Sequence, residues 1–459
     1  MSSFEAVIEG IGRHGEGYIE RDGRRLYLDG MLPGDRVRLS VARTGKPRLL
    51  RLIESSPHRI EPACEIADFC GGCALISLDY ERALEEKERL LREAAEIDAS
   101  NEAVETSATN EAVETSATNE AVETSATNEA VDAPPQRAES PRVQANPNVR
   151  MHPSSETLGY RRRARLAFNA RRGTLGYRAR RSNALVDAPA CPILTRRLEV
   201  ALPALRSLIR SFQGRGEITL GDTLDGIYAT IDAEDFQPPS AYEALAALAA
   251  SPGWAGIAFR IAGVPTPSIW GRTSERHRAA DGLDLETPPG GFLQVNAGIN
   301  AALARRVAEW AEPEGASIVE LFSGAGNLSV LLAPGAASLL AIEEYAPASE
   351  YARTNLKRRG QHAKLVASRV EEVSLPRGDV LVLNPPRSGY PGLRRALHAV
   401  RPERVVLVSC DLGSLRRELR TLRSEGYELI ALEGFDMFPR TPHLEAAALL
   451  RPALADRPR

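Results

Sequence analysis

Hydrophobic and polar positions are patterned differently in three parts of the chain. Residues 1–55 hold short runs of alternating polarity separated by turn signals such as Asp22-Gly23, a pattern that predicts four or five short β-strands. That size and spacing favour a small module similar to the five-stranded oligonucleotide-binding barrel. Residues 56–99 and 154–285 mix helical and strand patterns, and we interpret them as one α+β domain.

Residues 286–459 follow the alternation of an α/β domain. Short apolar runs are separated by amphipathic stretches such as AGINAALARRVAEWAE; the runs are SIVELF, SLLAIE, DVLVLN and VVLVS. Uniformly apolar runs of this length are typical of parallel strands that helices cover on both faces. We therefore predict a Rossmann-like domain, in which ligands bind beyond the carboxyl ends of the strands, within a multidomain α/β protein.

A low-complexity segment interrupts the second part. The nine-residue unit NEAVETSAT occurs three times in tandem from Asn101 to Thr127, and a fourth copy begins at Asn128. With one valine per unit, the segment has too little apolar surface to offset the entropy lost on ordering. We expect residues 100–153 to be a disordered acidic insertion without a catalytic role. A helical spacer is the alternative, because Glu and Ala favour helix.

Composition is that of a protein with a hydrophobic core and no membrane segment. Of 459 residues, 43% are hydrophobic. No run approaches the roughly 20 apolar residues that span a bilayer. The first residues, MSSFEAVIEG, lack the basic start and apolar run of a secretory signal. We expect a cytoplasmic monomer without a membrane partner. The net charge of −3 hides an asymmetry, since residues 101–139 hold nine acids and one arginine, which leaves +5 on the remainder.

Four of the five cysteines form one candidate metal site. Cys64, Cys70 and Cys73 follow the spacing Cys-x5-Cys-x2-Cys. The fourth, Cys191, lies far along the chain in the run DAPACPIL. In a reducing compartment these residues are not expected to form disulfides. Four thiolates satisfy either a zinc ion or an iron–sulfur cluster, and the spacing does not decide between them. Unrelated buried thiols are the remaining alternative.

A basic stretch follows the insertion. From Tyr160 to Arg181 the chain has nine arginines and no acids, interleaved with Tyr160, Phe168 and Tyr177. The alternation in RARLAFNAR and the turn at Gly173 predict a hairpin with a basic face. Because arginines contact phosphates and aromatic rings stack on bases, this surface would suit single-stranded RNA. The alternative is a solvated surface in a chain rich in arginine.

The first strand of the α/β domain ends in a candidate cofactor loop. Gly324 and Gly326 permit a tight turn and close approach of the backbone to a cofactor, with a helix starting behind them. The next strand ends about 20 residues on at Glu343, where an acid can bind ribose hydroxyls. Together they fit a nucleoside cofactor. NAD is the rival, but the third glycine of its fingerprint is missing, and Asn327 and Leu328 follow the second.

Three later positions carry candidate chemistry. Cys410 comes directly after the buried run VVLVS, where ligands are expected, although a lone cysteine is more commonly a small buried hydrophobe. Asn384 precedes a rigid Pro-Pro turn, and its amide can match the ring N–H and carbonyl of uracil or serve an amino substrate. Glu445 lies in an apolar context just before the last strand. It is a candidate base with a raised pKa, or else an acid at a strand edge.

The order of these motifs resembles that of a known family over nearly the whole chain apart from the repeats. The motifs are HGEGYIERDGRRLYLDGMLPGDRV, which resembles an RNA-binding TRAM domain, the cysteine set, GGFLQVN, ELFSGAGN, AIEEY, NPPRSG, VSCD and FPRTPHLE. The family is that of the RNA 5-methyluridine methyltransferases, which use S-adenosylmethionine. Two positions depart from its usual pattern: Asn384 replaces an Asp, and Leu412 replaces a Pro.

The resemblance implies a role for each candidate residue. A [4Fe-4S] cluster, in preference to zinc, would be held by Cys64, Cys70, Cys73 and Cys191. The methyl-donor pocket would be lined by Gln294, Phe322, Gly324, Gly326, Asn327, Glu343 and Asn384. Cys410 would add to carbon 6 of uracil as the nucleophile, and Glu445 would remove the proton from carbon 5. A TRAM-like module together with a cluster resembles the ribosomal RNA members more than the transfer RNA members.

Two other functions remain open from the residues alone. The first is an amino-group methyltransferase that uses Asn-Pro-Pro, ranked second because Arg387, not an aromatic residue, follows the prolines. The second is a non-catalytic RNA-binding scaffold with a metal site.

Overall fold

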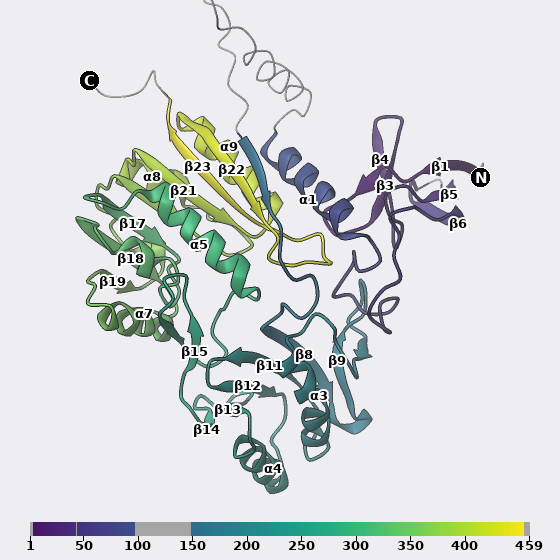
Figure 1. Cartoon of the computed structure of the whole chain (residues 1–459), viewed down its shortest axis with the longest axis horizontal. Helices are drawn as coiled ribbons and strands as arrows, with labels where there is room; N and C mark the ends of the chain where they lie inside the picture. The colour runs from purple at the N-terminus through teal and green to yellow at the C-terminus, as the bar shows by residue number, and fades with distance from the viewer. Residues whose placement is uncertain (1–2, 43, 97–147, 454–459) are drawn as a thin grey trace, which may run out of the picture.

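The computed structural model describes residues 3–42, 44–96 and 148–453, and it contains three structural units (Figure 1). The NEAVETSAT repeats, and with them most of the expected insertion, lie outside these residues. Among the described residues, no helix is both long and apolar enough to cross a membrane.

The N-terminal unit contains six strands in two three-stranded sheets, ordered β1-β5-β6 and β2-β3-β4. The strands are β1 (Ser3–Val7), β2 (Gly10–Ile11), β3 (Gly17–Arg21), β4 (Arg24–Leu28), β5 (Arg36–Val41) and β6 (Pro47–Glu54). Ile8, Ile19, Leu28, Val37 and Leu39 form their common core. The closed five-stranded barrel stays a prediction, because the hydrogen-bonded ladders form two separate sheets.

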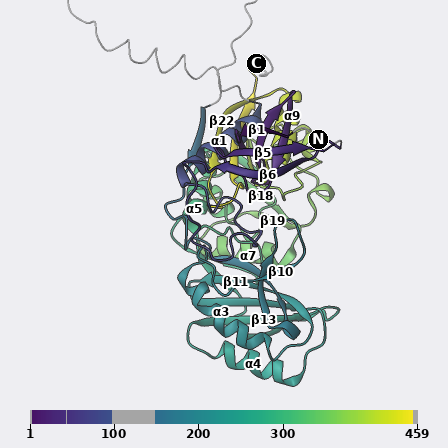
Figure 2. The ribbon, with the colours of Figure 1, turned by 90° about the vertical axis from the view of Figure 1, so that its right-hand side faces the viewer.

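The central unit is a seven-stranded sheet ordered β10-β9-β8-β11-β12-β13-β14. Its strands are β8 (Arg163–Asn169), β9 (Thr174–Arg178), β10 (Leu185–Asp187), β11 (Arg215–Thr223), β12 (Gly226–Ala233), β13 (Trp254–Ile261) and β14 (Ser268–Gly271). Helices α3 (Arg196–Ile209) and α4 (Pro239–Ala249) contribute to the same apolar cluster as the strands. The hairpin β15 (Glu275–Arg278) and β16 (Asp284–Thr287) leads on to the C-terminal unit. In Figure 2 this central unit lies at the end of the molecule opposite the N-terminal sheets.

The C-terminal unit is an eight-stranded sheet ordered β19-β18-β17-β20-β21-β23-β22-β7. The strands are β17 (Ser317–Leu321), β18 (Ser338–Glu343), β19 (Lys364–Ala367), β20 (Val380–Leu383), β21 (Arg404–Ser409), β22 (Tyr427–Phe435), β23 (Glu445–Pro452) and β7 (Asn148–His152). Strands β17 to β21 are parallel, as predicted, whereas β23 runs antiparallel between β21 and β22.

Helices cover both faces of this sheet. They are α5 (Ala297–Ala311), α6 (Ser329–Leu332), α7 (Ala346–Arg358), α8 (Leu393–Val400) and α9 (Leu412–Ser424). Along β20, Leu381 and Leu383 pack in one cluster with α8 and α9, while Val380 and Val382 pack in the other with α5 and α6. Because successive side chains point to opposite faces, both must be apolar, which explains the uniform apolar runs.

Both ends of the insertion belong to the C-terminal unit. Strand β7 pairs in parallel with β22 at the edge of the eight-stranded sheet. Helix α1 (Tyr80–Ala95) contributes Leu91 and Ala95 to the cluster that contains α8 and α9. The expected boundaries are therefore wrong at two points: residues 148–152 are a strand rather than insertion, and α1 packs on the C-terminal sheet rather than in the central domain.

Helix α1 also contacts the N-terminal unit. Glu86 accepts a hydrogen bond from the Ile11 backbone N–H at 3.0 Å, and Glu93 forms an ion pair with Arg25 at 2.8 Å. On another side of the helix, Lys87 forms a fully buried ion pair with Asp436, a residue that directly follows β22. The helix thus connects the N-terminal sheets to the C-terminal sheet through charged contacts on two of its sides.

Candidate active site

The predicted chemistry-bearing residues of the C-terminal unit follow the carboxyl ends of neighbouring parallel strands. The loop from Phe322 to Asn327 follows β17, Glu343 ends β18, Asn384 follows β20 and Cys410 follows β21. Because these strands are adjacent and parallel, their ends meet at one edge of the sheet. The structure therefore brings the predicted residues of this unit together there.

Strand pairing sets Glu445 beside Cys410. In the antiparallel pair β21·β23, Ser409 lies opposite Ala446, so the residues just beyond them, Cys410 and Glu445, are at the same end of the ladder. Glu445 is 3% exposed, and its charge acts directly on the Cys410 thiol. A thiol and a carboxyl group 35 positions apart in sequence thus share one site through the reversal of a single strand.

The surroundings of Cys410 favour the neutral thiol. Burial raises the pKa of the Cys410 thiol to about 11, and the Glu445 carboxylate adds to this effect. Arg387, in the loop after β20, acts in the opposite direction through its charge and a hydrogen bond. Arg387 thus provides a cation beside the thiol, but burial and the Glu445 carboxylate outweigh its effect on the Cys410 pKa.

Glu445 ionises near neutral pH. Burial raises the pKa of its carboxyl group to about 7, although a hydrogen bond with the Gln294 side chain and the charge of Arg387 oppose the rise. A carboxyl group with this pKa is half ionised at the pH of the cell, as a general base should be. Gln294 is itself held from the central unit, where the Arg162 guanidinium donates to its backbone carbonyl at 2.9 Å. The structure therefore places Gln294 against the candidate base.

The glycine loop is open on one side and closely packed on the other. Gly324 and Gly326 both have positive φ, of 56° and 87°. A Cβ on Gly324 would meet nothing within 4 Å, whereas one on Gly326 would lie 3.3 Å from Ala352 of α7. The Glu343 carboxylate accepts a hydrogen bond from the Gly324 N–H at 2.9 Å. The backbone at Gly324 is therefore open to a ligand, and the acid of the next strand lies beside it.

The other predicted donor-pocket residues surround this loop. Phe322 has a φ of 64°, unusual for a residue with a side chain, and its ring packs edge-on against Tyr390 with centroids 5.3 Å apart. Asn327 exchanges two amide hydrogen bonds with Asn300 of α5, each 3.0 Å long, so its amide ties the loop to that helix. Asn384 is half-buried at the end of β20.

Helix α9, which begins two residues after Cys410, fixes the loop that carries Arg387. The Ser414 hydroxyl donates to the Arg387 carbonyl at 2.5 Å, and the buried Glu418 accepts from the Tyr390 N–H at 2.9 Å. We did not predict Glu418. The available signal was an acid on the apolar face of a helix, among residues at helical spacing.

Relatives of known activity match this chain over its length. A curated protein of Hahella chejuensis is 28% identical over 487 residues, covering 99% of this chain and 98% of its own. A second, of Chromohalobacter salexigens, is 30% identical over 469 residues, covering 96% and 88%. Both are named 23S rRNA (uracil(1939)-C(5))-methyltransferase RlmD. The chain belongs to the RNA uracil-C5 methyltransferase family. No family model matches it.

A solved structure supports the fold of this methyltransferase. The Pyrococcus abyssi tRNA (uracil-54, C5)-methyltransferase, in complex with S-adenosyl-L-homocysteine, superposes with a TM-score of 0.70 at 21% identity. The match covers 97% of this chain and 100% of the other. This match shows a shared fold over nearly the whole chain. With the curated relatives, it identifies the enzyme as an S-adenosylmethionine-dependent RNA methyltransferase of the uracil-C5 class.

The four predicted ligand cysteines of the methyltransferase gather in one place. Burial raises the pKa of Cys73 to about 12, and the charges of Cys191, Cys70 and Cys64 add to the rise, so the other three thiols lie close enough to act on Cys73. All four are free thiols. The Tyr177 hydroxyl donates to the Cys191 sulfur at 3.5 Å. Within the described residues, no three Cys, His or acidic side chains are arranged as the ligands of a single metal ion. Four convergent thiols nevertheless fit the donor set of a cluster.

The basic stretch is less accessible than expected. Tyr160 and Phe168 are buried in the central unit, and the Tyr177 hydroxyl points to Cys191. The predicted stacking of bases on these rings is therefore wrong. The predicted hairpin is confirmed, because β8 and β9 pair antiparallel around the turn at Gly173. It is not free, however: β8 also pairs with β11 inside the seven-stranded sheet, and Arg162 and Arg163 are buried.

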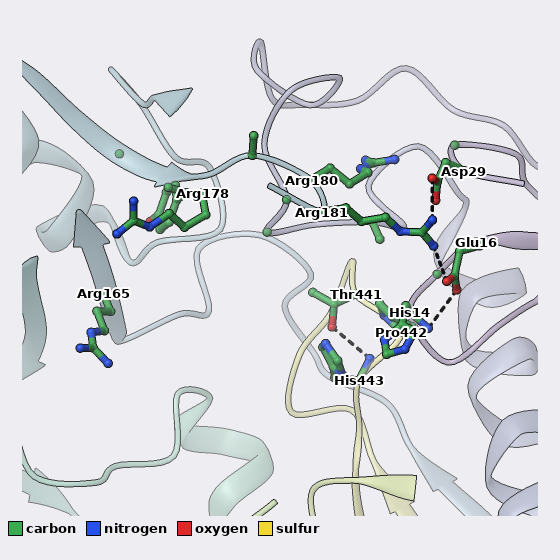
Figure 3. A pocket seen from close by; sticks show the side chains of 18 of the residues that line it. His14, Glu16, Asp29, Arg165, Arg178, Arg180, Arg181, Thr441, Pro442 and His443 are labelled. Carbon is green, nitrogen blue, oxygen red and sulfur yellow. Dashed lines mark hydrogen bonds and ion pairs between the residues drawn. The ribbon is translucent and has the colours of Figure 1, made fainter. Parts of the chain in front are cut away.

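Four other arginines of the stretch line a cavity of about 750 Å³ (Figure 3); they are Arg165, Arg178, Arg180 and Arg181. Thr441, Pro442 and His443, from the loop before β23, form another wall of it. Loss of solvent lowers the pKa of His443 to about 4, and the charges of Arg387 and Asp411, which flank Cys410, reach this ring. The cavity therefore adjoins the site that holds the thiol and the carboxyl group.

Proposed function

We propose that this enzyme transfers a methyl group from S-adenosylmethionine to carbon 5 of a uridine in 23S ribosomal RNA through a covalent adduct with Cys410. The names of its relatives support the ribosomal substrate. The observation that carries the covalent route is the β21·β23 register, because it joins a thiol and a buried carboxyl group beyond the glycine loop. An N-terminal RNA-binding module and a monomeric enzyme are part of the same proposal.

The chemistry explains why both groups are needed. Carbon 5 of uracil is a weak nucleophile, so the Cys410 sulfur adds to carbon 6 and leaves an enolate. Carbon 5 then takes the methyl group, and S-adenosylhomocysteine leaves. Glu445 removes the hydrogen on carbon 5, and the carbon–sulfur bond breaks to restore the thiolate. Arg387 is the cation that favours this thiolate.

The raised pKa values add a step to this sequence. At neutral pH Cys410 begins as a thiol and must lose its proton before it adds. Glu445, half ionised and acting electrostatically on the thiol, is the acceptor that we assign to this proton. It must release that proton before the last step, so Glu445 handles two protons in each turnover.

The test compares variants on unmodified 23S ribosomal RNA. Cys410→Ala should lose all detectable methyl transfer while its affinity for S-adenosylmethionine, measured by calorimetry, stays within about twofold, because the glycine loop is untouched. Glu445→Gln should accumulate a protein–RNA adduct that survives denaturation. Full activity of Cys410→Ala would overturn the proposal. A product methyl on an exocyclic nitrogen would support an amino-group enzyme, and donor binding without any transfer would support a scaffold.

We also propose that Cys64, Cys70, Cys73 and Cys191 hold a [4Fe-4S] cluster. Its role would be structural, because a cluster there joins the segment before α1 to the central unit. The loop that carries Cys73 continues to Leu75, whose N–H donates to the Arg440 carbonyl at 2.9 Å in the loop before β23. Iron, sulfide and zinc analysis of protein purified without oxygen distinguishes a cluster from zinc.

A further inference from the structure

The cavity beside the active site is formed where all three units meet. His14 and Glu16 reach it from the N-terminal sheets, and Gly71 and Gly72 from the cysteine loop. The units are in close contact there, since a Cβ on Gly15 would lie 2.7 Å from the Ala74 Cβ. In Figure 3, Arg165 and Arg178 lie across the cavity from the loop that carries Thr441 and His443, whereas Arg180 and Arg181 lie near Asp29 and Glu16. The cavity wall thus carries both arginines and acids, among them Glu16, Asp29 and Glu217.

Most of the positive charge on this wall is already neutralised. Arg165 forms an ion pair with Glu217 across β8 and β11. Arg178 lies 4.0 Å from the same carboxylate and donates to the Asn183 carbonyl at 3.0 Å. These two arginines would have to exchange an existing partner for a phosphate.

Arg181 is engaged as well, but Arg180 is not. Arg181 forms ion pairs with Glu16 and, at 2.8 Å, with Asp29, which join the basic stretch to the N-terminal unit. The Arg180 side chain has no hydrogen bond or ion pair to any described residue. Its Nε is buried without an acceptor. Burial removes hydrating water from this charged group. Buried polar groups normally regain that lost free energy through a hydrogen bond, and the Arg180 Nε has none.

We propose that Arg180 binds a backbone phosphate of the RNA strand that carries the target uridine. The planar fork of a guanidinium matches the oxygens of a phosphodiester and makes strong, charge-assisted hydrogen bonds to them. The uridine must leave its stack to reach Cys410, and a fixed phosphate beside it would hold the strand in that position. This inference rests on the proposed function, because it places the phosphate relative to the nucleophile.

One other role for Arg180 is testable alongside this one. Its backbone N–H donates to the Phe69 carbonyl at 3.3 Å, and its charge reaches the neighbouring Cys70. Arg180 would then be a counter-charge for the cysteine site rather than a phosphate ligand. The two roles differ in what is lost on substitution, since the first concerns RNA and salt and the second concerns bound iron.

The experiment measures methyl transfer to unmodified 23S ribosomal RNA, transcribed in vitro, over a series of KCl concentrations. Arg180→Ala should raise KM at least about tenfold, since a hydrogen bond to a charged group is lost, while kcat changes little. The slope of log KM against log salt should fall by about 0.7, the value for one phosphate contact on a single strand. Arg180→Lys should keep the slope and recover part of the affinity.

Arg377→Ala is the matched control. This arginine is exposed in the loop before β20, at the end of the sheet away from the site, and its removal changes the net charge equally. Its KM and salt slope should equal those of the wild type. An unchanged slope in Arg180→Ala, or a loss of iron with unchanged RNA affinity, would overturn the inference. If the wild type methylates no uridine, the proposed function fails, and equilibrium binding of the same RNA still tests Arg180.

Discussion

The buried carboxyl group of Glu445 should make the folded enzyme less stable at high pH. Its pKa is about 7 in the folded protein against a usual value of 4.5, so folding favours the protonated form. Above the folded pKa, the protein must bury a charge that the unfolded chain exposes to water. Each unit of pKa difference corresponds to about 1.4 kcal/mol, so the cost reaches about 3 kcal/mol above pH 8 and falls to about 1 kcal/mol near pH 5.5.

The variant Glu445→Gln removes this charge and should therefore be more stable than the wild type at high pH. Thermal denaturation followed by circular dichroism should show a rise in Tm of several degrees above about pH 8, shrinking as the pH falls. The matched control is Glu428→Gln, which removes an exposed acid from β22 and should show no such trend. A Tm of Glu445→Gln equal to or below that of the wild type above pH 8 would refute the reasoning.

Two further substitutions test other contacts. Lys87→Met leaves Asp436 buried without its cation and should lower the free energy of unfolding, measured by urea denaturation, by about 3–5 kcal/mol. Adding Asp436→Asn should recover part of that loss. If the two substitutions lower the free energy additively, the pairing is contradicted. Gly326→Ala places a Cβ against α7 at positive φ and should weaken S-adenosylmethionine binding at least about tenfold in calorimetry, since both effects distort the loop. Gly360→Ala is the control, because Gly360 also has positive φ but has open space around it. Its effect reports the cost of backbone strain without a Cβ crowded against a neighbouring helix.

The parallel part of the C-terminal sheet was predictable because its strands are apolar on both faces, and that pattern is visible in the sequence. Cys410 could be located for the same reason, as the first residue after such a strand. The position of Glu445 could not, because it depends on the antiparallel pairing of β23 with β21. Strand β7 was missed because its partner, β22, lies far along the chain, and no local pattern records that pairing.

The alternation of polarity in β8 correctly predicted a strand. The prediction that its basic side would be exposed was wrong. A period of two shows that a strand has two different sides, but not which neighbours cover them. Tyr160 and Phe168 pack inward, and Arg163 pairs with the buried Glu275 at 2.8 Å. The number of arginines alone therefore overestimated how much of this stretch is free to bind RNA. Arg180 could be recognised as the arginine without a side-chain partner only once the ion pairs of its neighbours were known.

The attachment of helix α1 has a practical consequence for dissecting this enzyme. Glu86 accepts from the Ile11 N–H and Glu93 pairs with Arg25 of the N-terminal unit, while Lys87 is buried against the C-terminal one. Truncating the first 55 residues would remove these contacts of α1 and one wall of the cavity beside the active site at the same time. Loss of activity in such a deletion would say little about RNA recognition, so point substitutions are the informative tool here.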